Sequence, residues 1–146
     1  MNTYILWIER DCVKWFHIER EGTKERVLHR REIRHHTSNA PENLKNTDKF
    51  FHKVAESIQG AEEILLVGPS LGKEHFRDYL EKHRGFGLAG KVVGILTLGP
   101  HTDNQILARS REFFRYYDVF GESPSRDKPR KAETEGTGTS TSPVDS

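Results

Sequence analysis

The chain has 146 residues, of which 31% are charged and 34% are hydrophobic, with a mean hydropathy of -0.76 and a formal net charge of +1. A single cysteine, Cys12, excludes an intramolecular disulfide, and with it a secreted scaffold held together by disulfides. No stretch approaches the roughly 20 apolar residues that cross a bilayer, and charges interrupt the early apolar run, so we expect a cytoplasmic protein without a membrane partner.

The first strand that the sequence predicts has a clear alternation of side chains. On the two-residue period of a β-strand, successive side chains point to opposite faces of a sheet. Tyr4, Leu6 and Ile8 therefore share one face, while Ile5 and Trp7 share the other. We expect this strand to be the first of three antiparallel strands.

Two further strands follow in the first third of the chain. We expect the second from Cys12 to Ile18, where β-forming residues are frequent. A turn at Glu21 to Thr23, in which Gly22 can take a positive φ, leads to a third strand from Glu25 to Ile33. This strand is more polar, so we expect its charges to protect a sheet edge. Between Arg34 and Asn46 the periodicity stops, which predicts a long loop.

The remainder of the chain alternates helices with strands. Two short apolar segments, Glu63 to Val67 and Val92 to Leu98, are expected to form buried strands. Apolar residues at helical spacing predict a helix before, between and after them. The predicted caps of the three helices are Asn46 or Thr47, Ser70, and Thr102 or Asp103.

The whole order is three antiparallel strands followed by helix, strand, helix, strand and helix. Parallel strands joined by a helix need a right-handed crossover, so this order predicts an α/β protein with helices packed on a mixed sheet. It is the order of ribonuclease-H-like folds. We expect one such domain over residues 1–120, followed by a disordered tail over residues 121–146, which are rich in Ser, Thr, Gly, Pro and charges.

A group of cations around the predicted loop is the first candidate site. A local positive patch of this kind suits contacts to the phosphates of RNA. The alternative is a solvated loop that binds nothing. A zinc site made from the adjacent histidines lacks a recognised ligand spacing, so we expect no metal. The predicted RNA-binding residues are Arg30, Arg31, Arg34, His35, His36 and Lys45.

A second candidate site combines two turns that follow the apolar strands. The glycine turn after the first of them is like a phosphate-binding loop, but it is one residue too short and has Glu74 where the magnesium-binding Ser or Thr should be. The second turn places polar groups at a helix start beside a strand end, although helix capping alone also explains them. The possible ligand or anion site comprises Gly68, Ser70, Gly72, Lys73, His101, Asp103 and Gln105.

Catalytic patterns are hard to find in the chain. The expected buried strands have no interior acid of the kind that nucleases use to hold metal, and no Ser/His/Asp order with a nucleophile elbow is present. We therefore expect neither catalytic residues nor a cofactor, while an enzymatic use of the second candidate site stays open.

Several motifs in their combined order resemble a known family. The likeness covers roughly residues 3–118, and its clearest parts are residues 48–56, 63–69, 92–95 and 101–108 together with Phe113 and Phe114. These parts resemble small bacterial proteins described as translational machinery proteins, relatives of the central domain of archaeo-eukaryotic class I release factors and of the ribosome-rescue factor Pelota. The chain departs from that pattern at Pro100 and His101, where the family has His before Pro.

The resemblance implies a ribonuclease-H-like domain that acts in translation, with the ribosome or structured RNA as partner. In the release factors, the loop before the first helix carries the Gly-Gly-Gln tripeptide that supports peptidyl-tRNA hydrolysis. The chain has no Gly-Gly-Gln, so the resemblance implies a non-catalytic module. A protein-interaction domain whose tail recruits partners is a further alternative.

Overall fold

The structure is a computed structural model that describes residues 1–22, 24–34 and 44–121, with side chains from residue 47 onward in the last range. The described residues form β1 Asn2–Glu9, β2 Cys12–Glu21, β3 Lys24–Arg34, α1 Leu44–Ser57, β4 Glu63–Gly68, α2 Gly72–Lys82, the 3₁₀ turns η1 Arg84–Phe86 and η2 Ala89–Lys91, β5 Val92–Thr97 and α3 Asp103–Phe120. The predicted order of strands and helices is confirmed. Residues 35–43 of the predicted loop and 122–146 of the predicted tail lie outside the described residues.

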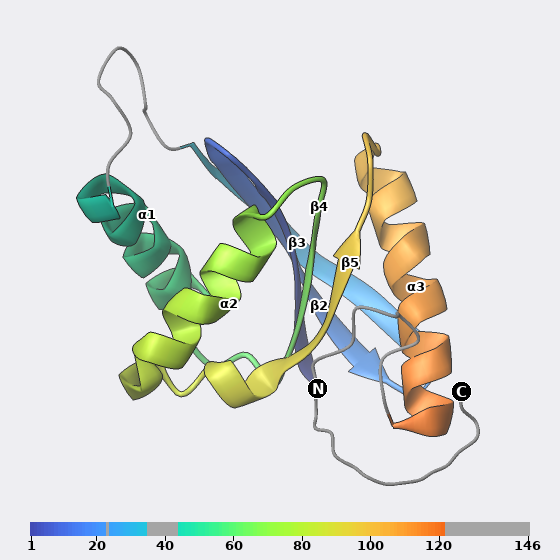
Figure 1. The fold of residues 1–146 in the computed structure, drawn as a ribbon. Helices are drawn as coiled ribbons and strands as arrows, with labels where there is room; N and C mark the ends of the chain where they lie inside the picture. The colour runs from blue at the N-terminus through green and yellow to red at the C-terminus, as the bar shows by residue number, and fades with distance from the viewer. Residues whose placement is uncertain (23, 35–43, 122–146) are drawn as a thin grey trace, which may run out of the picture.

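The strands form one mixed sheet in the order β3-β2-β1-β4-β5. β1 and β3 each pair with β2 in antiparallel fashion, whereas β4 is parallel to both β1 and β5. Helices α1 and α2 cover one face of the sheet, and α3 covers the other (Figure 1). This arrangement confirms the predicted ribonuclease-H-like class. Because β1, β4 and β5 are parallel, their carboxyl ends lie at the same edge of the sheet.

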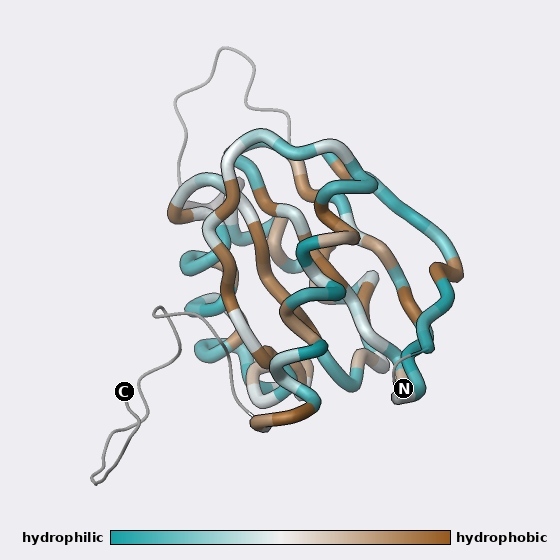
Figure 2. Tube along the Cα trace, turned by 90° about the vertical axis from the view of Figure 1, so that its right-hand side faces the viewer, coloured by the Kyte–Doolittle hydropathy of each residue, from teal (hydrophilic) through white to brown (hydrophobic). Residues whose placement is uncertain are grey.

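Two hydrophobic clusters fill the spaces between the sheet and the helices. The predicted alternation of the first strand is confirmed: Tyr4, Leu6 and Ile8 belong to the cluster under α1 and α2, and Ile5 and Trp7 to the cluster under α3. The trace is hydrophobic along the inner strands and alternates along the helices (Figure 2). β4 is buried along its whole length, as its apolar sequence predicts.

β5 differs from the prediction of a second buried strand. It has the same apolar composition as β4 but is the outer strand of the sheet, and of its six residues only Gly94 and Ile95 are buried. Gly94 is required by packing, since a Cβ at this position would lie 2.5 Å from ring carbons of Phe113 in α3. The lack of a side chain at Gly94 therefore lets α3 approach the sheet.

Three further expectations about element ends are wrong. α1 begins before Asn46 and Thr47, so these residues lie inside the helix and do not cap it. α2 starts without a side-chain cap, so Ser70 does not serve as one. β3 continues to Arg34, because its pairing with β2 extends as far as Cys12. The predicted turn at Gly22 is confirmed by its φ of 61°.

Candidate nucleic-acid interface

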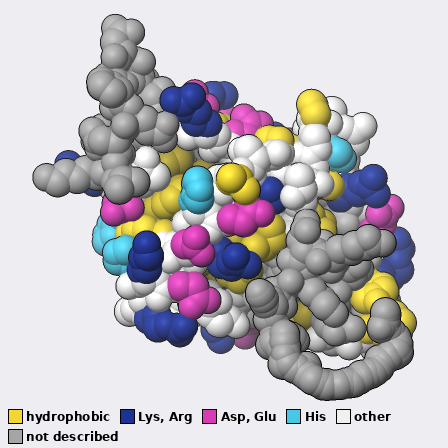
Figure 3. Space-filling view, in the orientation of Figure 1, with side chains coloured by type: hydrophobic (Ala, Val, Ile, Leu, Met, Phe, Trp, Pro, Cys, Tyr) yellow, Lys and Arg dark blue, Asp and Glu magenta, His cyan; other side chains and the backbone are white. Residues whose placement is uncertain are grey.

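β3 is an outer strand of the sheet and carries half of the predicted RNA-binding residues. Its cations are Lys24, Arg26, Arg30, Arg31 and Arg34, and its carboxylates are Glu25 and Glu32. Five cations against two carboxylates give the strand a formal charge of +3, and nearly all of its residues are exposed. In the view of Figure 3, by contrast, acidic and basic side chains are interspersed. The residues of β3 itself therefore carry a net positive charge.

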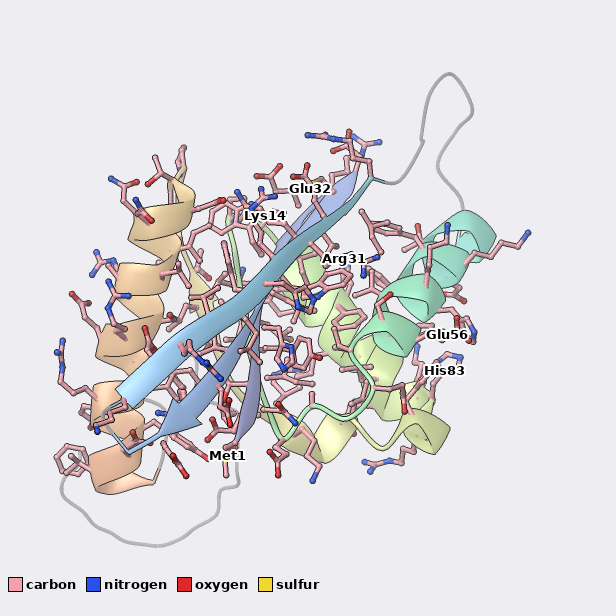
Figure 4. All side chains as sticks on the ribbon, turned by 180° about the vertical axis from the view of Figure 1, so that it is seen from behind. Met1, Lys14, Arg31, Glu32, Glu56 and His83 are labelled. Atoms are coloured by element: carbon pink, nitrogen blue, oxygen red, sulfur yellow. The ribbon has the colours of Figure 1, made fainter. Side chains whose placement is uncertain are left out.

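The three predicted arginines do not form one loop group, because they lie on a strand and on two faces of it. Arg30 pairs with Phe16 of β2 and Arg34 with Cys12, which places both on the face of α3. Arg31 pairs with Trp15 and lies on the face of α1, where its guanidinium is 5.9 Å from the Trp15 ring (Figure 4). A strand exposes alternate residues on alternate faces, so one phosphate cannot contact all three.

Arg30 is part of an ion-pair cluster at the start of α3. Its Nε donates to Oδ2 of Asp103 at 2.6 Å, and Nζ of Lys14 donates to Oδ1 of the same carboxylate at 2.8 Å. Partial burial opposes ionisation of Asp103, but the hydrogen bonds from Lys14 and Arg30 outweigh it, so the pKa of Asp103 is lowered. Asp103, predicted as a ligand residue, is thus the shared acceptor for two cations.

Arg34 is also paired with a carboxylate. Its Nη2 lies 2.9 Å from Oε2 of Glu32, and Arg30 donates to the other oxygen of Glu32 at 3.1 Å. The thiol of Cys12 lies 3.3 Å from Oε2 of Glu32. Burial, the hydrogen bond to Glu32 and its negative charge together raise the pKa of Cys12 to about 11. Arg31 has no carboxylate partner among the described residues, so it differs from both neighbouring arginines.

The turn before α3 uses its polar groups internally. Thr102 caps the helix as predicted: its Oγ1 accepts the backbone N–H of Gln105 at 3.2 Å, and Oε1 of Gln105 accepts the backbone N–H of Thr102 at 2.8 Å. His101 lies 2.8 Å through Nδ1 from the Gly99 carbonyl oxygen, and its ring centroid is 6.3 Å from that of Trp7. The side-chain oxygen of Gln105 is therefore occupied by the capping box.

The glycine turn after β4 is shaped by packing. Gly68 has a φ of 154°, and a Cβ there would collide with the backbone carbonyl oxygen of Ile8. Lys73 is buried, with its Nζ donating to the Ser70 carbonyl oxygen at 2.6 Å and lying 3.5 Å from Oε1 of Glu74. Its ammonium is held inside the protein and does not face an open anion site.

An open pocket of about 490 Å³ lies next to this turn, between the end of β1, α1 and the start of α2. Ser70 and Gly72 line it together with Glu9, Arg10 and His75. Among the described residues, no lining residue comes from the turn before α3. The predicted site is therefore divided. Of its first half, Ser70 and Gly72 border the pocket. Of its second half, Asp103 belongs to the ion-pair cluster and Gln105 to the helix cap.

Some predicted residues cannot be placed in full. His35 and His36 lie outside the described residues, and Lys45 lies in the first turn of α1 with its side chain outside them. In residues 1–22, 24–34 and 44–121, no three His, Cys, Asp or Glu side chains are grouped so as to hold a metal ion. None of the helices in these same ranges combines the length and apolar character needed to span a bilayer.

A buried ion-pair network centred on Arg20 is a feature that the sequence analysis missed. Its guanidinium donates to both oxygens of Glu63 at 3.0 and 3.1 Å and to both oxygens of Asp118 at 2.9 and 3.0 Å. Oγ1 of Thr3 donates to Glu63 at 2.7 Å, and the guanidinium lies 3.9 Å from the Phe114 ring centroid. The available signal was weak: a charged residue that follows Phe16 and Ile18 on the same strand face, and a glutamate at the start of an apolar strand.

Comparison with known proteins shows similarity at the level of the fold. No protein-family model and no curated protein matches the chain. Pelota of Thermoplasma acidophilum has a similar structure, with a TM-score of 0.54 and 14% identity over 81% of this chain and 40% of Pelota. Pelota of Archaeoglobus fulgidus gives a TM-score of 0.51 and 15% identity over 81% of this chain and 37% of Pelota. The chain thus spans well under half the length of either Pelota.

Proposed function

We propose that this protein is a non-catalytic module that binds the ribosome or structured RNA in the manner of a translation factor, within the bacterial translational machinery family and in the cytoplasm. The observation that carries this proposal is the fold shared with part of Pelota, combined with a formal charge of +3 on the outer strand β3. Under this proposal the folded domain comprises residues 1–120, and residues 121–146 form a tail.

The proposed contact surface is centred on Arg31. Phosphate oxygens compete with any carboxylate that already pairs with an arginine, and Arg30 and Arg34 both have such carboxylates. Arg31 is exposed and has none among the described residues. Arg30, Arg34, His35, His36 and Lys45 extend this surface, and Arg31 supplies the charge that is free to bind. Because the chain lacks Gly-Gly-Gln, the proposal includes no peptidyl-tRNA hydrolysis.

Co-sedimentation with 70S ribosomes and with separated subunits over a salt series tests the proposal. Each phosphate contact contributes about 0.7 to 0.9 to the slope of log affinity against log salt. Arg31→Ala should weaken binding at every salt concentration and reduce this slope by about one contact. Lys91→Ala is the matched control, because Lys91 is an exposed cation that precedes β5 at the far edge of the sheet.

The co-sedimentation experiment has three distinguishable outcomes. Salt-sensitive pelleting that Arg31→Ala weakens and Lys91→Ala retains supports the β3 surface. Absence of pelleting at low salt would exclude the ribosomal function. Equal loss in both variants would instead indicate attraction by general charge and would remove the assignment to β3.

A second candidate function is small-ligand or phosphate binding, or catalysis, in the pocket beside the glycine turn. Polar side chains of Glu9, Arg10, Ser70 and His75 line this pocket together with aromatic residues of α1. It predicts thermal stabilisation by a phosphate-bearing metabolite, about 2.7 kcal/mol at a hundredfold excess over Kd. His75→Ala should lose that stabilisation, and Arg31→Ala should keep it. A metabolite screen without any stabilised sample would argue against this function.

A further inference from the structure

A second pocket lies on the face of α3, at the end of β3 far from Arg34. It has a volume of about 320 Å³ and opens between the β2–β3 turn and the C-terminal half of α3. Figure 1 shows that turn beside the last turns of the helix. The lining residues are Arg20, Gly22, Lys24, Glu25, Arg111, Phe114, Arg115, Asp118 and Val119. Ten residues of strand at about 3.3 Å each separate Lys24 from Arg34, so this pocket is distinct from the proposed ribosome surface.

The carboxylates of this pocket are already paired. Asp118 accepts two hydrogen bonds from the buried Arg20, at 2.9 and 3.0 Å. Glu25 accepts one from Arg111 at 3.2 Å. Neither acid is therefore available to repel an incoming anion at full strength, and both hold an arginine side chain in place at the pocket wall.

Two cations of the pocket have no such partner. Lys24 and Arg115 are exposed, and the side chain of neither forms an ion pair or hydrogen bond with any described residue. The lining contains four cations and two carboxylates. If Glu63, the other partner of Arg20, is counted as well, there are four cations and three carboxylates, so the net charge is still positive. The surplus positive charge thus comes from the two side chains that are free to bind.

The rest of the lining is apolar or flat. Phe114 is buried beneath the Arg20 guanidinium, whose centre lies 3.9 Å from the ring centroid. Val119 is 72% exposed, so its apolar side chain is accessible at the pocket. Arginine planes and apolar side chains are surfaces on which a nucleobase stacks or packs. The pocket volume is at the lower limit of the range for small-molecule sites, which suits one nucleotide.

We propose that this pocket binds a single nucleotide, with its phosphate between Lys24 and Arg115 and its base against Val119 and the Arg20–Phe114 stack. The shared chemistry is a phosphate joined to a flat, weakly polar group. It can come from a free nucleoside monophosphate or from the 5′ end of an RNA strand. The proposal does not depend on ribosome binding by β3.

A titration of the full chain, followed by ¹H–¹⁵N NMR and calorimetry, tests the site. Adenosine 5′-monophosphate should shift the amide signals of Gly22, Glu25 and Val119 and leave those of the far edge at β5 unchanged. Adenosine and inorganic phosphate should each bind at least about tenfold more weakly, since each lacks one half of the ligand. A 5′-phosphorylated tetra-adenylate that binds more tightly than the monophosphate identifies RNA as the source, and equal affinities identify the free nucleotide.

Paired variants separate this site from general charge. Lys24→Ala/Arg115→Ala should weaken monophosphate binding by about tenfold or more, because both charge-assisted contacts are lost. Lys82→Ala/Lys91→Ala removes the same charge from exposed positions elsewhere and should retain binding. Arg31→Ala should retain it as well, so failure at this pocket and failure at β3 are distinguishable. No amide shift up to about 10 mM monophosphate, equal binding of adenosine, or equal loss in both double variants would each overturn the proposal.

Discussion

Replacing Arg20 by methionine should destabilise the protein more than any exposed charge substitution. The side chain of Arg20 is 9% exposed and that of Glu63 is 8%, so the variant leaves a carboxylate buried without its counter-ion. Removing one partner of a buried pair costs about 3–5 kcal/mol. Asp118 adds little, because its side chain is 37% exposed and water can replace the arginine. The retained hydrogen bond from Thr3 to Glu63 offsets part of the loss. We therefore expect about 3 kcal/mol.

Urea unfolding followed by tryptophan fluorescence measures this loss, since Trp7 and Trp15 are both buried in the native state. A double variant, Arg20→Met/Glu63→Met, should recover most of the stability, because replacing both ions of a buried pair by apolar groups is often nearly neutral. Arg26→Met removes an exposed pair from the neighbouring strand, where the arginine side chain is 75% exposed, and should change the free energy of unfolding by at most about 0.5 kcal/mol. A cost for Arg20→Met as small as that of Arg26→Met, or no recovery in the double variant, would refute the reasoning.

Three other predictions concern packing, the thiol and pH. Gly94→Ala places a Cβ 2.5 Å from ring carbons of Phe113 and should lower the free energy of unfolding by about 1–3 kcal/mol, as measured by urea unfolding. Adding Phe113→Leu should restore part of this stability. An unchanged urea midpoint for Gly94→Ala would contradict this packing. With a pKa of about 11, Cys12 is about one part in a thousand thiolate at pH 8, so a disulfide reagent should label it only after unfolding, and rapid native labelling would show that the thiol is accessible. The pKa of Asp103 is lower in the folded state than in the unfolded state. The ionised carboxylate therefore contributes its full stability above the unfolded pKa of about 3.9, and this contribution disappears as the pH falls through the folded pKa. The stability difference between the protein and Asp103→Asn should shrink in acid, and a constant difference from pH 7 to pH 2 would argue against the ion pairs.

The sequence was sufficient for the elements whose pattern is local. The alternation of the first strand predicts that each of its faces is covered, and the continuous apolar run of β4 predicts burial on both sides. Both predictions are confirmed. β5 has an equally apolar sequence, but its exposure depends on its position at the end of the strand order, which no local pattern contains. The end of β3 was missed because polar residues on an outer strand have no burial alternation to read.

The candidate sites were harder to predict, because side-chain partners are distant in the sequence. Asp103 and Arg30 are 73 residues apart, and Arg20 and Asp118 are 98 apart, so neither pair has a sequence signature. The use of Gln105 was readable, since Thr102 followed three residues later by Gln is a capping-box pattern. The internal bond of Lys73 required knowledge of the turn geometry that buries its ammonium.

These partners also change which residues are informative about function. A cation that is held by a carboxylate or a carbonyl oxygen has a structural reason to be present, and Arg30, Arg34 and Lys73 each have one. Arg31, and the pair Lys24 and Arg115, have no such reason among the described contacts, although they keep positive charge exposed at the surface. Exposed arginine and lysine side chains lose conformational entropy on binding, so contacts from them are strongest where two or more converge on one anion. By that criterion the pocket beside α3, which is lined by two free cations, Lys24 from β3 and Arg115 from α3, is the better-built anion site. The surface around Arg31 needs the extended phosphate backbone of an RNA to supply its affinity.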